Sequence, residues 1–233
     1  MNPQSNDHNV FIKKCVSRTA FERELHIYSK TLEMTPRLLG FTRPDVIVLE
    51  KVDGIPYLDH PDGFDAAMLG KTLASFHKTL WKNGITICQY DNQPKNILLV
   101  SKPEDEVKEQ GAEIIKNRNI NLIGGETSVW HKLQHNFCFI DFSDARLDHP
   151  ENDVSHLMLF WAEEFDVSKF AFLTSVFVSS YTRQVNLNKK IWLLLLRENI
   201  ERFDRRRKIY NKIPDRVPKN RSENRELLFE MEF

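Results

Sequence analysis

One segment constrains the fold of this chain more than any other. An apolar run at residues 97–100 (ILLV) follows directly on the amide Asn96, and the carboxylate Asp91 lies five residues before that amide. A short apolar run of this kind is typical of a buried strand, which anchors the preceding loop in a core. We therefore expect Asp91 and Asn96 to be held firmly where they still face a cleft. A carboxylate can accept a proton from an attacking hydroxyl, and an amide oxygen is a hard ligand that suits magnesium.

A second segment repeats this pattern. The apolar run at residues 137–140 (FCFI) ends in another carboxylate, Asp141. Asp141 is the natural second ligand for a cation that Asn96 also binds. Two such strand ends suit phosphoryl transfer, because that reaction depends mainly on positioning and on neutralising charge.

Together the two segments resemble the catalytic loop and the D-F-G segment of the protein-kinase-like superfamily. The resemblance is to its compact members, which are the aminoglycoside, choline and lipopolysaccharide sugar kinases and the small atypical protein kinases. Asp91 and Asn96 match the spacing of the H-R-D-x-x-x-x-N signature, whereas Gln89 replaces its His and Ser143 replaces the Gly of D-F-G. The resemblance implies an α+β, bilobal protein-kinase-like fold, with a reduced N-lobe that lacks an obvious Gly-rich loop and a mainly helical C-lobe.

The same resemblance assigns residues to the phosphate donor. Lys13 lies in a predicted strand at residues 10–14 (VFIKK) and is similar to the V-A-I-K lysine that contacts the α- and β-phosphates of ATP. A helix follows, with Thr19 and Glu22 as a predicted capping box. Glu24 lies at the edge of its apolar stripe and is the expected ion-pair partner of Lys13, with Glu22 as a substitute. A solvent-exposed edge lysine is the structural alternative for Lys13.

Residues 46–54 (VIVLEKVDG) predict an apolar strand that runs into a turn. By the resemblance this segment is the hinge, where the backbone from Glu50 to Val52 would bind the edge of adenine. The alternative interpretation of residues 46–54 is a core strand followed by a glycine turn, which would give the same sequence pattern. We expect a reduced N-lobe at 1–52, a C-lobe at 53–213 with an inserted hairpin at 101–136 around Gly124 and Gly125, and a loose charged tail at 214–233.

The rest of the C-lobe is predicted to be helical. An amphipathic helix spans residues 65–81, and His77 beside its apolar face is expected to be a core histidine. Another helix begins near residue 152, with Asn152 or Asp153 available to cap it. Asp153 alternatively supports the catalytic loop, as a similar Asp does in aminoglycoside-kinase relatives. The cations from Arg205 to Lys208 suit a helix end and are expected to be solvated, with a phosphorylated substrate, RNA or an anionic lipid as the alternative partner.

The composition argues against several other classes of protein. Lys plus Arg and Asp plus Glu both number 33, so no overall field favours nucleic acid or an anionic membrane. The three cysteines form no C-x-x-C pair, which favours buried reduced thiols. No apolar run approaches the roughly 20 residues that a membrane span needs, and the N-terminus lacks a signal-peptide pattern, so we expect a cytoplasmic protein. The oligomeric state stays open.

Three interpretations of function follow. The first is an ATP- and Mg²⁺-dependent phosphotransferase in which Asp91 is the base, Lys13 and Glu24 serve the donor phosphates, and Asn96 and Asp141 bind the metal. Its acceptor is expected to be a small hydroxylated molecule or sugar, because no long activation segment follows Asp141; a small atypical serine/threonine protein kinase is the variant of this interpretation. The second is a pseudokinase that binds nucleotide or a partner. The third is an α+β domain whose acidic loop ends are only turns.

Overall fold

The strands predicted near the N-terminus form an antiparallel sheet. The computed structural model describes residues 10–57, 65–100, 121–122, 137–210 and 221–233. Within these residues the sheet has the order β1-β3-β2-β7, with the bounds β1 (Val10–Lys14), β3 (Val46–Glu50), β2 (Leu38–Thr42) and β7 (Asn121–Leu122). Lys13 lies opposite Ile47 in the register of β1 and β3. The predicted strand that carries Lys13 is therefore confirmed, and it lies at an edge of this sheet.

Helix α1 (Arg18–Tyr28) follows β1 and begins earlier than the sequence predicts. Its N-cap is Ser17, whose Oγ accepts a hydrogen bond from the backbone N–H of Ala20 at 3.1 Å. The predicted capping box was therefore wrong, because Thr19 lies inside the first turn. Ser17 takes the extended backbone that an N-cap needs, and its hydroxyl satisfies an N–H that the helix leaves unpaired.

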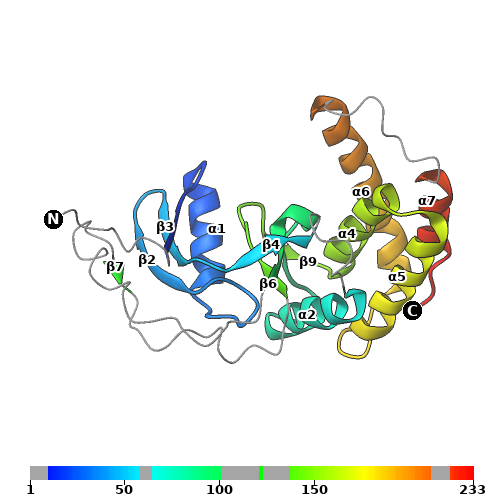
Figure 1. Ribbon diagram of the computed structural model, residues 1–233, viewed down its shortest axis with the longest axis horizontal. Helices are drawn as coiled ribbons and strands as arrows, with labels where there is room; N and C mark the ends of the chain where they lie inside the picture. The colour runs from blue at the N-terminus through cyan, green and yellow to red at the C-terminus, as the bar shows by residue number, and fades with distance from the viewer. Residues whose placement is uncertain (1–9, 58–64, 101–120, 123–136, 211–220) are drawn as a thin grey trace.

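Two further sets of strands lie next to this sheet (Figure 1). One has the order β4-β6-β8, with the bounds β4 (Gly54–Pro56), β6 (Ile97–Val100) and β8 (Phe137–Phe139). The other pairs β5 (Thr86–Cys88) with β9 (Arg146–Asp148). Both apolar runs singled out in the sequence are thus strands, and Ile97 pairs with Phe139 in an antiparallel register. That pairing brings the polar ends of the two runs to the same place.

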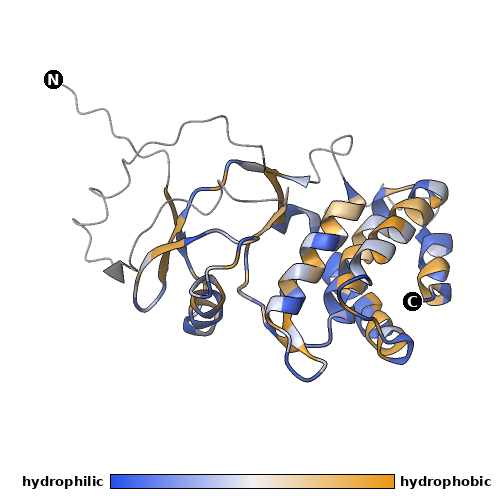
Figure 2. Cartoon of the chain, turned by 90° about the horizontal axis from the view of Figure 1, so that it is seen from below, coloured by the Kyte–Doolittle hydropathy of each residue, from blue (hydrophilic) through white to orange (hydrophobic). Residues whose placement is uncertain are grey.

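Helices fill the other end of the molecule. Their bounds are α2 (Ala66–Thr79), α4 (Glu151–Glu164), α5 (Val167–Tyr181), α6 (Lys189–Tyr210) and α7 (Arg221–Glu230). Figure 2 shows hydrophobic and hydrophilic segments alternating along these helices, as expected for helices that bury one face. Gly70 lets α2 approach α5 closely, because a Cβ at this position would lie 2.5 Å from the carbonyl oxygen of Phe177. The α+β class predicted from the sequence is confirmed.

The C-terminal residues correct one expectation. Residues 221–230 form α7 and are not part of a loose tail. Leu228 of α7 is buried, and its carbonyl accepts a hydrogen bond of 2.8 Å from Trp192 Nε1. The charges of this helix are also matched, since Arg225 pairs with Asp204 at 2.8 Å and with Glu163 at 3.3 Å. A sequence dense in charges therefore packs as a helix because two other helices, α6 and α4, supply the counter-charges.

Other expectations have mixed outcomes. The hairpin predicted around Gly124 and Gly125 lies outside the described residues, as does most of the insertion at 101–136. All three cysteines are buried and free, as predicted. Among the parts of the chain that the structure describes, no helix is both long and apolar enough to cross a membrane.

His156 in α4 is expected to make the stability of the fold depend on pH. Its side chain is buried, and its Nδ1 has no hydrogen-bond partner among the described residues. Burial, followed by repulsion from Arg202, lowers the pKa of His156 from 6.5 to about 4. Because this pKa is lower in the folded chain than in the unfolded chain, the stabilisation is complete above about pH 6.5 and is lost as the pH falls towards 4.

We therefore expect the free energy of unfolding to fall by about 2–3 kcal/mol between pH 7 and pH 4.5 through His156 alone. Denaturant unfolding at both pH values would measure this difference. The variant His156→Phe keeps an aromatic ring beside Phe160 and Phe203 and should lose this part of the pH dependence. If the free energy of unfolding of this variant falls as much between the two pH values as that of the wild type, other groups cause the pH dependence.

Candidate active site

Lys13 connects two segments that are far apart in the sequence. Its Nζ lies 2.7 Å from Glu24 Oε1 and 2.9 Å from Asp141 Oδ1. β1 presents Lys13, and α1 presents Glu24, whose side chain is fully buried. Asp141 follows β8 and is half-exposed. The predicted Lys13–Glu24 ion pair therefore exists, and it includes the carboxylate that was predicted to bind metal.

The charges in this cluster influence one another strongly. Burial lowers the pKa of Lys13, but the neighbouring Glu24 and Asp141 outweigh that effect, so the pKa of Lys13 lies above its ordinary value. Burial raises the pKa of Asp141, but the hydrogen bond and charge of Lys13 reverse the effect, so the pKa of Asp141 lies below its ordinary value. Lys13 is thus a cation and Asp141 an anion at neutral pH.

Asn96 and Asp91 lie in one loop and contact each other directly. Asn96 ends the short helix η2 (Pro94–Asn96), and its Nδ2 donates to the backbone oxygen of Asp91 at 2.9 Å and to Asp91 Oδ2 at 3.3 Å. Gln93 Nε2 also donates to Asp91 Oδ2. Because the amide N–H groups of Asn96 are directed at Asp91, its Oδ1 remains as the atom that can bind a cation.

This loop lies against the segment that leads to Asp141. The backbone N–H of Ile140 donates to the carbonyl of Asn96 at 3.0 Å. Gln89, which replaces the expected His, donates from Nε2 to the carbonyl of Ile140. Asp141 has a φ of 63°, and Ser143 Oγ donates to Asp141 Oδ1 at 2.8 Å. Both departures from the family pattern therefore make hydrogen bonds that hold the loop and orient Asp141.

Asp153 supports the same loop from α4. Its two carboxylate oxygens accept the backbone N–H groups of Gln89 at 2.7 Å and Tyr90 at 2.9 Å. His77 Nε2 lies 3.2 Å from the same carboxylate, and His77 Nδ1 lies 2.6 Å from the hydroxyl of Tyr181. Asp153 does not cap α4, because the N-cap is Pro150 and no side chain caps it. Of the two roles left open by the sequence, the structure shows support of the loop.

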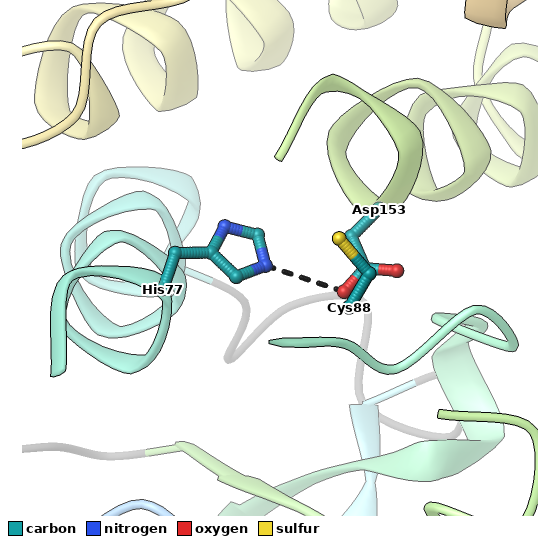
Figure 3. Close-up of side chains that lie close together, drawn as sticks. All are labelled: His77, Cys88 and Asp153. Carbon is teal, nitrogen blue, oxygen red and sulfur yellow. Dashed lines mark hydrogen bonds and ion pairs between the residues drawn. The ribbon is translucent and has the colours of Figure 1, made fainter. Parts of the chain in front are cut away.

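His77, Cys88 and Asp153 lie close together, with one candidate metal-ligand atom from each within 4.8 Å of the others (Figure 3). Hydrogen bonds account for all three, because Cys88 Sγ donates to the carbonyl of His149 at 3.3 Å. Burial raises the pKa of the Cys88 thiol well above its ordinary value, which disfavours the thiolate that binds metals. We interpret the cluster as a hydrogen-bonded part of the core, as the sequence predicted for His77.

No family model matches this sequence, and no curated protein matches it. The structure is similar to choline kinase LicA from Streptococcus pneumoniae, with a TM-score of 0.55 and 11% identity over 97% of this chain and 88% of that chain. It is also similar to aminoglycoside phosphotransferase APH(3'')-Id from Streptomyces rimosus, with a TM-score of 0.51 and 12% identity over 82% of this chain and 85% of that chain. The chain has a protein-kinase-like fold. The resemblance stated from the two loop segments is thereby confirmed for the fold.

The hinge predicted for a protein-kinase-like fold is only partly free to bind a ligand. The backbone N–H of Glu50 donates to the carbonyl of Arg37 at 2.9 Å, and the Glu50 side chain lies 3.5 Å from Arg37 Nε. Glu50 is therefore tied to its own sheet through both its N–H and its side chain. Val52 follows the strand, and its backbone groups make no backbone hydrogen bond within the described residues. Adenine binding at Glu50 and Val52 stays a prediction, with Val52 the better placed of the two.

Arg206 is a site residue that the sequence analysis missed. Its Nη1 lies 2.8 Å from Asp91 Oδ1, and its Nη2 lies 3.4 Å from Asp144 Oδ2. The next residue, Arg207, pairs with Glu163 at 2.6 Å. Arg206 and Arg207 remain partly exposed, as expected for this basic segment, but each forms an ion pair that the sequence did not predict, because α6 packs along α4 and brings its last turns to the loop that carries Asp91.

Proposed function

We propose that this chain is an ATP- and Mg²⁺-dependent phosphotransferase that moves the γ-phosphate to the hydroxyl of a small molecule or sugar. The observation that carries the proposal is the contact of Lys13 with both Glu24 and Asp141, because it joins a cation for the donor phosphates to a carboxylate for their metal. The sheet with α1 would be the N-lobe, and the helical part would be the C-lobe. The similarity to two kinases of small molecules supports this class of acceptor.

The oxygen atoms around the loop fit a magnesium ion. Asp141 Oδ1 is bound by Lys13 and Ser143, so Oδ2 is the oxygen that remains for a metal. Asn96 Oδ1 accepts no hydrogen bond from the described residues, since the hydrogen bonds of this side chain come from Nδ2. Carboxylate and amide oxygens are the ligands that Mg²⁺ prefers. When bound, the ion would neutralise charge on the donor phosphates.

In the proposed reaction Asp91 receives the proton of the acceptor hydroxyl. The acceptor oxygen forms a bond to the γ-phosphorus, the bond from that phosphorus to the β–γ bridging oxygen breaks, and ADP leaves with the electron pair. Lys13 would hold the donor phosphates in place. Asn96 and Gln93 fix the Asp91 carboxylate from the loop, and Arg206 fixes it from α6. Such positioning supplies much of the rate, because the reacting atoms then meet in line.

One observation favours the pseudokinase as a second candidate. Both carboxylate oxygens of Asp91 are engaged, Oδ1 by Arg206 and Oδ2 by Gln93 and Asn96. An acceptor hydroxyl must share one of these oxygens. A carboxylate oxygen has more than one acceptor direction, so a hydroxyl can bind beside an existing donor. The hydrogen bonds of Gln89 and Ser143 also support an enzyme, because they keep the loop in place.

The two candidates are separated by transfer of labelled γ-phosphate from ATP, screened over hydroxyl compounds with Mg²⁺ and again with a chelator. A protein substrate and autophosphorylation should be included as further acceptors, which tests the serine/threonine kinase variant. The proposal predicts transfer to a small hydroxyl compound that stops when Mg²⁺ is removed. Nucleotide binding without transfer to any acceptor would support the pseudokinase instead.

A further inference from the structure

Two arginines enclose the ring of Tyr90, the residue directly before Asp91. The guanidinium carbon of Arg146 lies 3.2 Å from the ring centroid, and that of Arg202 lies 4.3 Å from it. Arg146 comes from β9 and Arg202 from α6, so two elements far apart in sequence meet at this ring. The stack therefore lies immediately beside the proposed catalytic base.

The position of Tyr90 is fixed by its backbone. Its φ of 68° lies in the left-handed region, which costs a residue with a large side chain a penalty that its surroundings must offset. The hydrogen bond from its N–H to Asp153 at 2.9 Å holds this conformation. The ring is thus placed between the two guanidinium groups by the same carboxylate that supports the catalytic loop.

Stacking leaves the hydrogen-bond donors of an arginine free. A guanidinium group stacks through its face, whereas its N–H groups lie along its edge and match the oxygens of phosphate or carboxylate. Neither Arg146 nor Arg202 has an ion-pair partner among the described residues, in contrast to Arg206 and Arg207. Arg202 Nε is buried and has no hydrogen-bond partner among the described residues. The Nη2 of Arg202 contacts only Asn152 Oδ1 there, at 3.3 Å.

Like charges also meet at this place. Burial, together with repulsion from Arg206 and Arg146, lowers the pKa of the Arg202 guanidinium below its ordinary value. The nearby carboxylates of Asp91 and Asp144 are already paired with Arg206, which adds a third cation to this place. A bound anion would relieve this repulsion and fill the unused donors of Arg146 and Arg202.

We infer that the acceptor carries an anionic group, best matched by a phosphate monoester, which the edges of Arg146 and Arg202 bind while a hydroxyl of the same molecule reaches Asp91. This inference rests on the proposed function and narrows its acceptor to phosphorylated hydroxyl compounds. A cationic acceptor would be repelled by the same pair. The chain would thus differ in acceptor charge from an enzyme that acts on choline.

The test compares matched acceptors in phosphate transfer: glycerol with glycerol 3-phosphate, glucose with glucose 6-phosphate, and choline as the cation. Glycerate is included as an acceptor whose negative charge comes from a carboxylate instead of a phosphate. We expect kcat/KM to be higher for the phosphorylated member of a pair by roughly tenfold or more. Arg146→Gln and Arg202→Gln should each remove roughly tenfold of that preference and leave the KM for ATP unchanged.

Arg205→Gln is the matched control, since Arg205 lies exposed on the same helix with no partner among the described residues. It should keep the preference. A variant effect on the KM for ATP alone would assign the arginines to the donor and overturn the inference. Transfer to uncharged or cationic acceptors that neither Arg variant alters would overturn it too, while the proposed function would stand.

A binding experiment separates the two proposals when no transfer is found. Titration calorimetry with inorganic phosphate, in the presence of Mg²⁺ and a non-hydrolysable ATP analogue, should show binding to the wild type that weakens roughly tenfold in each Arg variant. Melting curves of the variants confirm that they fold. Phosphate binding that weakens in the Arg variants, without phosphate transfer to any acceptor, would support the anion site and contradict the proposed enzyme activity. No phosphate binding to the wild type at millimolar concentration would reject the anion site.

Discussion

Replacing Asp91 with Asn should lower kcat for phosphate transfer by about 10²–10⁴-fold, the range expected for loss of a general base. An Asn side chain can still accept a hydrogen bond from Arg206 but cannot take up the hydroxyl proton. Asn offers one oxygen in place of two, so either Arg206 or the side-chain amides of Gln93 and Asn96 lose an acceptor, and we expect a loss of stability of about 1–2 kcal/mol because the site is partly exposed. The melting temperature is then expected to fall by about 2–8 °C.

Initial rates with ATP and Mg²⁺, together with melting curves, measure both effects. Asp144→Asn is the matched control, since Asp144 also contacts Arg206 but lies more exposed than Asp91. It should keep most of the activity. If the Asp91→Asn protein keeps more than about a tenth of the wild-type kcat, Asp91 is not the general base.

Asp153→Asn should destabilise the fold by about 3 kcal/mol and lower the melting temperature by about 6–12 °C. The Asp153 carboxylate is fully buried and accepts hydrogen bonds from the N–H groups of Gln89 and Tyr90, with His77 as a third neighbour. Asn offers one oxygen in place of two, so its NH₂ group would face a backbone donor. One buried N–H would then lose its partner. The loop that carries Asp91 should also loosen, and phosphate transfer should fall.

The control for this variant is Asp166→Asn. Asp166 is the N-cap of α5 and accepts the N–H of Lys169 at 2.9 Å in an exposed position. Asn caps a helix about as well as Asp, so this change should be nearly neutral. Denaturant unfolding of both variants measures the difference. Equal stability of the two variants would mean that Asp153 does not support the loop that carries Asp91.

Local patterns in the sequence were sufficient to predict the ion pair of Lys13 with Glu24. The strand at 10–14 was confirmed, and Glu24 could be chosen because its place at the edge of an apolar stripe turns it towards the sheet. The contact of Lys13 with Asp141 joins residues 128 positions apart, and no local pattern in the sequence predicted it.

The arginines that lie around Tyr90 and Asp91 could not be predicted in the same way. Arg202 and Arg206 belong to α6, and the packing of α6 against α4 brings them to Tyr90 and Asp91. Arg146 belongs to β9, and the pairing of β9 with β5, in which Arg146 lies opposite Cys88, brings it to Tyr90. No short-range pattern reports where the far end of a long helix lies. The helix start at Ser17 was missed for a related reason: Ser17 and Thr19 are both good N-cap residues, and the backbone leaving β1 decides between them.

The central claim is that Asp141 and Asn96 hold a magnesium ion beside Lys13 for the phosphates of ATP. Titration calorimetry of ATP binding, with and without Mg²⁺, on the wild type and on Asp141→Asn tests it most directly. The account predicts that Mg²⁺ strengthens ATP binding to the wild type by roughly tenfold or more and that Asp141→Asn loses this gain. ATP binding that Mg²⁺ does not change, or that responds equally in both proteins, would contradict it.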